Sequence, residues 1–146
     1  MKNPLYRAFI DAGVQAGYGE TEDYNGFRQE GFGQKFMNVD QGVRASSSHA
    51  YFKKLGIPSN LTILKHALVT RVLFDGKSAI GVECEVRGKR SEFRANKETI
   101  LSAGSIGSPQ LLQVSGIGPK EVIAAAGVGL VHDLPGVGEN LQDHLE

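Results

Sequence analysis

ETILSAGSIGSPQLLQVSGIGP, residues 98–119, is the stretch that decides the fold of this chain. Residues 99–101 are of strand type and predict a short buried strand, which stops at an alanine–glycine pair. A helix is expected next, with Ser108 as its N-cap and Pro109 in the first helical position, where a missing N–H costs nothing. The stretch thus predicts a strand, a bare turn and a helix. In open α/β sheets nucleotides bind at such strand ends, because small residues let a ligand approach the backbone.

A run of predicted strands precedes this stretch. Residues 79–86 alternate between an apolar face and a face with two glutamates, which is the period of a half-buried strand. Turn residues separate this segment from its neighbours, so the sequence predicts a β-meander that leads into the strand at residue 99. A further helix is expected from Pro119 to Gly127, and then a short strand within residues 128–134. The other expected strands of the meander cover residues 61–64, 67–74 and 91–95.

The first 59 residues have a different pattern. The Asn-Pro pair at positions 3–4 predicts a helix start, and the polar, glycine-rich residues 19–42 predict a long loop with a short strand near residues 35–39. A second helix is expected to be capped by Ser46 or Ser47. The side chains expected to face inward are Leu5, Phe9, Ala12 and Ala16 in the first helix, and Tyr51, Phe52 and Leu55 in the second.

Composition excludes several classes of function. The 146 residues carry 16 basic and 16 acidic side chains, so the net charge is zero, and no basic run supports binding to nucleic acid. No apolar run approaches the ~20 residues that span a bilayer, and no secretory signal is expected. The single cysteine excludes an internal disulfide and fits a reducing compartment. The expected location is cytoplasmic.

The common nucleotide and metal motifs are absent from the sequence. No GxGxxG, P-loop or GxSxG motif occurs, and the nearest pieces, residues 116–118 and 136–138, lack the third glycine. The chain therefore has no loop that cradles a pyrophosphate by itself. No metal site is expected, because none of the histidines stands at ligand spacing from another candidate ligand. Cys84 is expected to be a small buried hydrophobic residue. The histidines are His49, His66, His132 and His144.

The literal residues carry a family resemblance. GSIGSPQLLQVSGIG, residues 104–118, resembles the second signature of the glucose-methanol-choline (GMC) family of flavin oxidoreductases at every constrained position. The similarity covers essentially the whole chain, and its first part is similar to bacterial choline dehydrogenases of that family. The other segments that carry the resemblance are residues 3–18, 25–33, 60–83 and 133–146.

The resemblance implies a fold and a domain organisation. It implies an internal fragment of a much longer α/β enzyme, with a β-meander and a strand–turn–helix unit from a GMC-type domain that binds FAD. Residues 60–146 are expected to belong to this FAD-binding domain. Residues 1–59 are expected to be a piece of the substrate-domain side, with a helix, a long loop and a helix.

The resemblance also implies which residues contact the cofactor. The backbone of Val69 is expected to contact the adenine of FAD, although its side chain alone suggests only an ordinary strand valine. Ala103 and Gly104 are expected to let the adenosine part lie close to the sheet, and a larger side chain at Gly104 is expected to clash with the turn or with the ligand. No catalytic residue is expected in this chain, because the family's histidine base lies outside it. Asn140, Asp143 and His144 are weighed as further residues near the flavin.

The implied reaction is oxidation of a primary alcohol, with choline as the closest substrate, to the aldehyde by hydride transfer to flavin. The implied partners are the small alcohol and the rest of the parent chain, and the inner membrane surface is an alternative location to the cytoplasm. Two alternatives stay open. In the first, the chain is a stand-alone, non-catalytic binding or scaffold domain derived from the family. In the second, it is part of a GMC dehydrogenase or oxidase whose substrate is a different alcohol. The sequence does not separate oxygen from the respiratory chain as electron acceptor.

Overall fold

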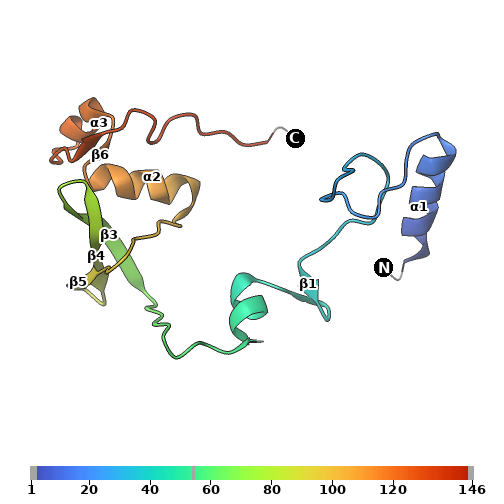
Figure 1. The fold of residues 1–146 in the computed structure, drawn as a ribbon, viewed down its shortest axis with the longest axis horizontal. Coiled ribbons are helices and arrows are strands. Elements are labelled where there is room, and N and C mark those ends of the chain that lie inside the picture. Colours follow the sequence, from blue (N-terminus) through green and yellow to red (C-terminus); the bar gives the residue numbers. More distant parts are fainter. Residues whose placement is uncertain (1–2, 54, 145–146) are drawn as a thin grey trace. The chain divides into compact units, whose positions relative to one another are not determined.

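A computed structural model describes residues 3–53 and 55–144 of the chain (Figure 1). The chain divides after Leu61 into two compact units, which we call the N-terminal unit and the C-terminal unit. Each unit has its own small core, and each is described by itself below.

Helix α1 (Pro4–Gln15) opens the N-terminal unit where the sequence predicts it. Asn3 caps it by accepting a hydrogen bond from the Leu5 N–H at 3.0 Å, and proline occupies the first turn. The buried face differs from the prediction, because the side chains predicted to face inward are exposed and Ile10 and Gly13 are buried instead.

A ring from the following loop explains why α1 turns this face inward. Phe32 lies so close to Gly13 that a Cβ at position 13 would overlap the ring. Phe9 and Tyr18 flank the same ring, with centroid distances of 5.2 and 5.4 Å. The helix therefore presents its bare glycine to the loop, and this packing outweighs the spacing of its larger apolar residues.

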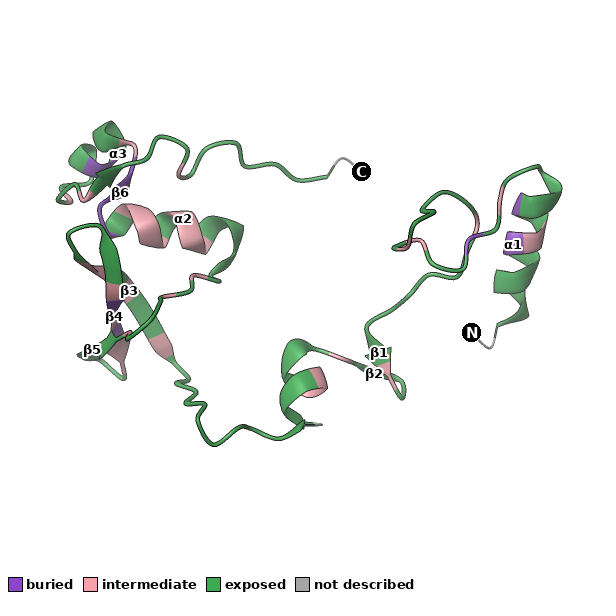
Figure 2. Ribbon diagram, viewed as in Figure 1, coloured by how far each residue is buried: buried purple, intermediate pink, exposed green. Residues whose placement is uncertain are grey.

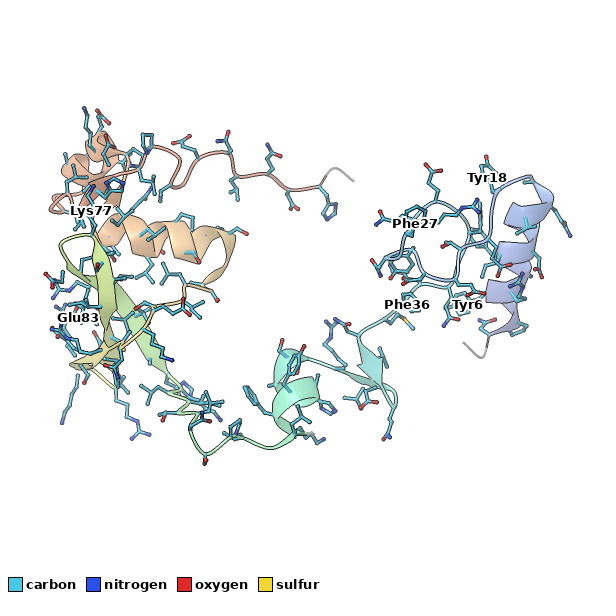
Figure 3. All side chains as sticks on the ribbon, viewed as in Figure 1. Tyr6, Tyr18, Phe27, Phe36, Lys77 and Glu83 are labelled. Carbon is cyan, nitrogen blue, oxygen red and sulfur yellow. The ribbon has the colours of Figure 1, made fainter. Side chains whose placement is uncertain are left out.

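The rest of the N-terminal unit is loop with short regular elements (Figure 3). Strands β1 (Val39–Asp40) and β2 (Val43–Arg44) form a small antiparallel hairpin, which lies later than the strand predicted near residues 35–39. The second predicted helix is a π-helical turn, η1 (Ser48–Lys53), and the Ser46 Oγ accepts from the His49 N–H at 3.3 Å. Its predicted inward face is wrong, because none of its described side chains is buried.

The C-terminal unit is built on the predicted meander. Strands β3 (Ala67–Asp75), β4 (Ser78–Val86) and β5 (Lys89–Arg94) form an antiparallel sheet in the order β3-β4-β5. Arg87 and Gly88 join β4 to β5 with positive φ values of 52° and 76°, the pattern of a type I′ hairpin turn. Cys84 is buried in the middle of β4, as predicted.

A compact group of short elements follows the sheet (Figure 2). Helix α2 (Gly104–Val114) packs against β3. Strands β6 (Ile117–Gly118) and β7 (His132–Asp133) form a parallel pair. Helix α3 (Lys120–Ala125) connects these two strands along the sequence. Ile117 and Ile123 are buried at their centre, and Ile123 is only 1% exposed. α3 lies within the helix predicted from Pro119 to Gly127, and β7 lies within residues 128–134, where the final strand was predicted.

Two details of the decisive stretch differ from the prediction. Residues 99–101 are not a strand, and Ile100 is 75% exposed. A strand needs hydrogen bonds from a neighbour, and no strand in the described part of the chain pairs with these residues. The predicted strand at residues 61–64 is absent for the same reason.

Helix α2 also begins five residues before the predicted first position. Ser108 is inside the helix, and its Oγ accepts from the Ala103 N–H at 3.0 Å instead of capping a helix that starts at Pro109. Pro109 is the sixth helical residue, where its missing N–H removes one helix bond, to the Ser105 carbonyl. The helix tolerates this loss so close to its start.

Candidate functional site

The C-terminal unit contains an open, mostly apolar cavity of about 740 Å³ between β3 and α2, here called the β3–α2 cavity. The start of β3, residues 99–103 and the inner side of α2 line it, and both Val69 and Ala103 are among the lining residues. Gly104 follows Ala103 as the first residue of α2 but is not part of the lining. Two of the three residues predicted to bind a cofactor therefore meet at one cavity, whose size is typical of small-molecule sites.

Val69 lies on an edge strand. It is 37% exposed, and it pairs with Cys84 immediately before an irregularity in the register of β3 and β4. The only strand that pairs with β3 in the described part of the chain is β4. The outer edge of β3 therefore carries backbone N–H and C=O groups that no strand uses, and such groups can recognise the polar edge of a ligand.

A side-chain cluster stabilises the irregular pairing of β3 and β4 beside Val69. The Thr70 hydroxyl donates to the Glu83 carboxylate at 2.7 Å, and Arg71 binds the same carboxylate at 3.1 Å. The hydrogen bond from Thr70 is the main reason that the pKa of Glu83 lies below its ordinary value; partial desolvation opposes the shift and the charge of Arg71 reinforces it. The cluster holds β3 and β4 together next to the cavity.

This cluster predicts a pH dependence. Because the pKa of Glu83 is lower in the folded chain, its carboxylate stabilises the fold above the unfolded pKa, and this stabilisation is lost as the pH falls through the folded value. Replacing Thr70 with valine is expected to raise the Glu83 pKa toward its ordinary value of about 4.3. An NMR titration of the Glu83 side chain in the two proteins measures this.

Thr21→Val is the matched control for that titration, since the Thr21 hydroxyl donates to the Arg28 carbonyl in the N-terminal unit. This variant is expected to leave the Glu83 titration unchanged. Identical Glu83 titrations in the Thr70→Val variant and the parent would contradict the assignment.

The turn at Ala103 and Gly104 is governed by backbone conformation. Gly104 has φ +85°, which L side chains rarely adopt, but a Cβ at this position would meet no atom of the described chain within 4 Å. Of the two predicted clashes, a Cβ therefore does not meet the one with the turn, and the clash with the ligand stays a prediction. Glycine is required here because of its positive φ, and the space beside it is open.

Thr99 is a lining residue that no sequence pattern singled out. Its Oγ1 is buried, and no group in the described part of the chain forms a hydrogen bond with it. A buried hydroxyl without a partner costs free energy, so native structures leave few of them. The available signal in the sequence was a hydroxyl at the start of an apolar run. It does not single out a binding residue, because threonine is also common in ordinary strands.

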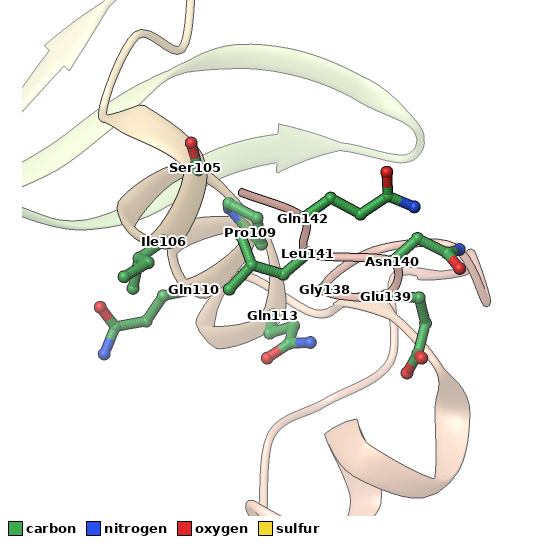
Figure 4. A pocket seen from close by; sticks show the side chains of 10 residues that line it. All are labelled: Ser105, Ile106, Pro109, Gln110, Gln113, Gly138, Glu139, Asn140, Leu141 and Gln142. Atoms are coloured by element: carbon green, nitrogen blue, oxygen red, sulfur yellow. The ribbon is translucent and has the colours of Figure 1, made fainter. Parts of the chain in front are cut away.

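A second open cavity, of about 790 Å³, lies between α2 and residues 138–142 (Figure 4). Gln113 ties this loop to the helix by donating from its Nε2 to the Val137 carbonyl at 3.1 Å. Asn140 lines this cavity, and its place near the flavin stays a prediction. Asp143 and His144 do not line it; both are exposed, and the His144 N–H donates to the Asp143 carboxylate at 2.9 Å.

Two further classes of site are not found among the described residues. No group of three or more His, Cys, Asp or Glu side chains in residues 3–53 and 55–144 is arranged to hold a metal ion. None of the helices in those ranges has the length and apolar content needed to cross a bilayer.

The chain is highly similar to known proteins. It is 62% identical over 144 residues to the oxygen-dependent choline dehydrogenase of Photobacterium profundum, and this match covers 99% of the chain and 25% of the relative. The enzyme of the same name from Vibrio vulnificus is 59% identical over 99% of the chain and 26% of the relative. The chain thus spans about a quarter of the length of the curated relatives it matches.

Solved structures of oxidoreductases are also similar to this chain. The pyridoxine 4-oxidase from Mesorbium loti superimposes with a TM-score of 0.75 at 35% identity, over 92% of the chain and 26% of that protein. A FAD-dependent oxidoreductase from Chaetomium thermophilum superimposes with a TM-score of 0.76 at 31% identity, over 97% of the chain and 25% of that protein. The fold is therefore an α/β fragment of the kind found in these enzymes. The family model described as GMC oxidoreductase matches residues 1–146, so the chain belongs to the GMC oxidoreductase family.

Proposed function

We propose that this chain is part of a longer FAD-dependent dehydrogenase that oxidises choline or a similar primary alcohol to the aldehyde. In this proposal residues 60–146 form part of the FAD-binding domain, and residues 1–59 lie on the substrate-domain side. The observation that carries it is the meeting of Val69 and Ala103 at one cavity, because both positions were expected to contact the adenosine of FAD.

The β3–α2 cavity has the chemistry that an adenosine group needs. Its walls include apolar side chains such as Leu68, Val82 and Leu111, which suit the faces of a flat heterocycle. The Thr99 hydroxyl, which has no partner among the described residues, and the outer edge of β3 supply hydrogen-bonding groups for the polar rim of a base. The residues present therefore fit the group.

The proposed roles divide as follows. The Val69 backbone would hold the adenine edge, and Ala103 and Gly104 would leave room for the attached ribose. When bound, FAD would supply the acceptor for the hydride that leaves the alcohol carbon. The residues of this chain would bind and orient the cofactor and exclude water from its base. None of them is proposed as the catalytic base, and the pyrophosphate-binding loop is proposed to come from another part of the parent enzyme.

A hybrid enzyme tests the proposal. We define it as the Photobacterium profundum relative with its matched segment, 62% identical to this chain, replaced by the chain. It is expected to purify with a flavin absorbance band and to consume oxygen when choline is added. A folded hybrid without flavin would contradict the cofactor assignment.

A different alcohol is the second candidate, because a solved relative at 35% identity is named for oxidation of pyridoxine. The same hybrid separates the two substrates when choline and pyridoxine are compared under identical conditions. Higher kcat/KM with choline is expected. A flavin-loaded hybrid that oxidises only pyridoxine would overturn choline as the substrate while leaving the cofactor assignment in place.

The isolated chain is expected to show no flavin absorbance band and no alcohol-dependent dye reduction, because its proposed share of the site includes no pyrophosphate loop. Either signal from the purified chain would contradict the proposal that the rest of the parent enzyme is needed to bind FAD and oxidise the alcohol. We also propose the cytoplasm, or the inner membrane surface facing it, as the location of the parent enzyme. Fractionation of cells that express the parent distinguishes these two places.

A further inference from the structure

Ser115 makes two buried hydrogen bonds at the end of α2. Its side-chain oxygen accepts from the Val72 N–H at 2.8 Å and donates to the Leu111 carbonyl at 2.5 Å. Ser115 is only 8% exposed, and Val72 is 5% exposed. One hydroxyl thus joins the outer edge of β3 to the last turn of α2.

The two elements joined by Ser115 are the walls of the β3–α2 cavity. Val69 precedes Val72 on the same strand, β3, while Leu111 and Val114 line the cavity from α2. A shift of Ser115 relative to Val72 would therefore move the end of the helix relative to the strand. A shift at this junction changes the width of the cavity where the adenosine is proposed to bind.

The backbone that follows Ser115 is restrained by close packing and by a hydrogen bond. Ser115 is therefore held in a fixed position. Gly116 has φ +88°, and a Cβ there would overlap the Gly129 carbonyl oxygen. The Gly116 carbonyl in turn accepts from the Val131 N–H at 2.8 Å. The segment that follows α2 is therefore packed against the chain before β7, and Ser115 projects from this support toward β3.

We propose that Ser115 is a positioning residue that sets the spacing of β3 and α2 and, through it, the affinity for the adenosine part of FAD. This inference rests on the proposed function, since it requires adenosine in the β3–α2 cavity. Ser115 itself would not touch the reacting atoms. Its removal would leave the Val72 N–H buried without a partner, and the strand and helix would separate to admit water.

The test compares Ser115→Ala and Ser115→Thr in the hybrid enzyme. The apoenzymes are titrated with FAD by flavin fluorescence, and kcat and KM for choline are measured at saturating FAD. The alanine variant is expected to raise the FAD dissociation constant about tenfold, with KM for choline unchanged. The threonine variant keeps the hydroxyl and is expected to bind FAD within about threefold of the parent.

Thr21→Ala is the matched control. Thr21 is 7% exposed, and its hydroxyl donates to the Arg28 carbonyl at 3.0 Å, so the variant also removes a buried hydroxyl, but in the N-terminal unit. Its FAD dissociation constant is expected to equal that of the parent. An equal weakening in the Thr21 and Ser115 alanine variants would show general destabilisation and would overturn the inference.

The remaining outcomes separate this inference from the proposed function. If Ser115→Ala binds FAD normally while Gly104→Val does not, the positioning role is wrong and the cofactor site stands. If neither variant alters FAD binding, both proposals fail. If Ser115→Ala does not fold, the threonine variant decides, and a loss of FAD affinity beyond about tenfold in that variant overturns the positioning role.

Discussion

Gly104→Val in the hybrid enzyme is expected to raise the FAD dissociation constant at least about a hundredfold, a loss of about 2.7 kcal/mol in binding free energy. A β-branched residue at φ +85° is strained, because its Cβ crowds its own backbone. The described chain leaves the space around a Cβ at this position open, and we propose that the new side chain would collide with the bound adenosine there. Strain alone costs about 1–3 kcal/mol of folding stability, and the overlap with the ligand adds the loss in affinity.

Gly127→Val is the matched control for this prediction. Gly127 follows α3 and has φ +69°, and, as at Gly104, a Cβ added there would meet no atom of the described chain within 4 Å apart from its sequence neighbours. The two variants are therefore expected to lose similar stability, measured by thermal unfolding. Only Gly104→Val is expected to lose FAD. Equal FAD affinity in the two variants would refute the adenosine site at this turn.

Among the glycine substitutions considered, Gly81→Ala is expected to produce the largest loss of folding stability, about 3–5 kcal/mol. A Cβ at position 81 would overlap the Phe93 carbonyl oxygen across the β4–β5 pair, and Gly81 has φ +147°. The substitution combines backbone strain with a steric clash against backbone, which cannot move without breaking the pairing of Gly81 with Arg94. The expected result is loss of β5 from the sheet.

Gly88→Ala provides the comparison within the same sheet. Gly88 has φ +76° in the β4–β5 turn, but a Cβ there meets nothing within 4 Å among the described residues beyond its own neighbours. Its cost is therefore backbone strain alone, about 1–2 kcal/mol. Thermal unfolding of the two hybrid variants, followed by circular dichroism, measures the difference. Equal losses would contradict the clash at Gly81.

The elements that the sequence predicted well are specified by local signals. The strands of the meander follow from two-residue alternation and from turn pairs such as Arg87-Gly88, and α1 begins where Asn3 caps it. These signals act between residues that are close in the sequence, so they do not depend on how the rest of the chain packs. The same holds for the glycine-rich turn at the start of α2.

The predictions that failed concern contacts with distant parts of the chain. Residues 99–101 have strand composition, but a strand also needs a paired neighbour, which the described residues do not provide. The predicted buried face of α1 was wrong because the Phe32 ring packs against Gly13. Glycine has no apolar side chain, so it does not register in a periodic pattern of apolar residues. The start of α2 was placed too late because Pro109 was assigned to the first turn, whereas the helix accommodates it one turn later.

By itself, the sequence determined the family of this protein, its meander and its bare turn before α2, because signature residues, alternation and turn chemistry are written in adjacent positions. Only the tertiary structure decided that Val69 and Ala103 share a cavity, that the Thr99 hydroxyl inside it lacks a partner among the described residues, and that Ser115 joins the cavity walls. The physical reason is that these contacts join residues far apart in the chain, and packing of β3 against α2 brings them together.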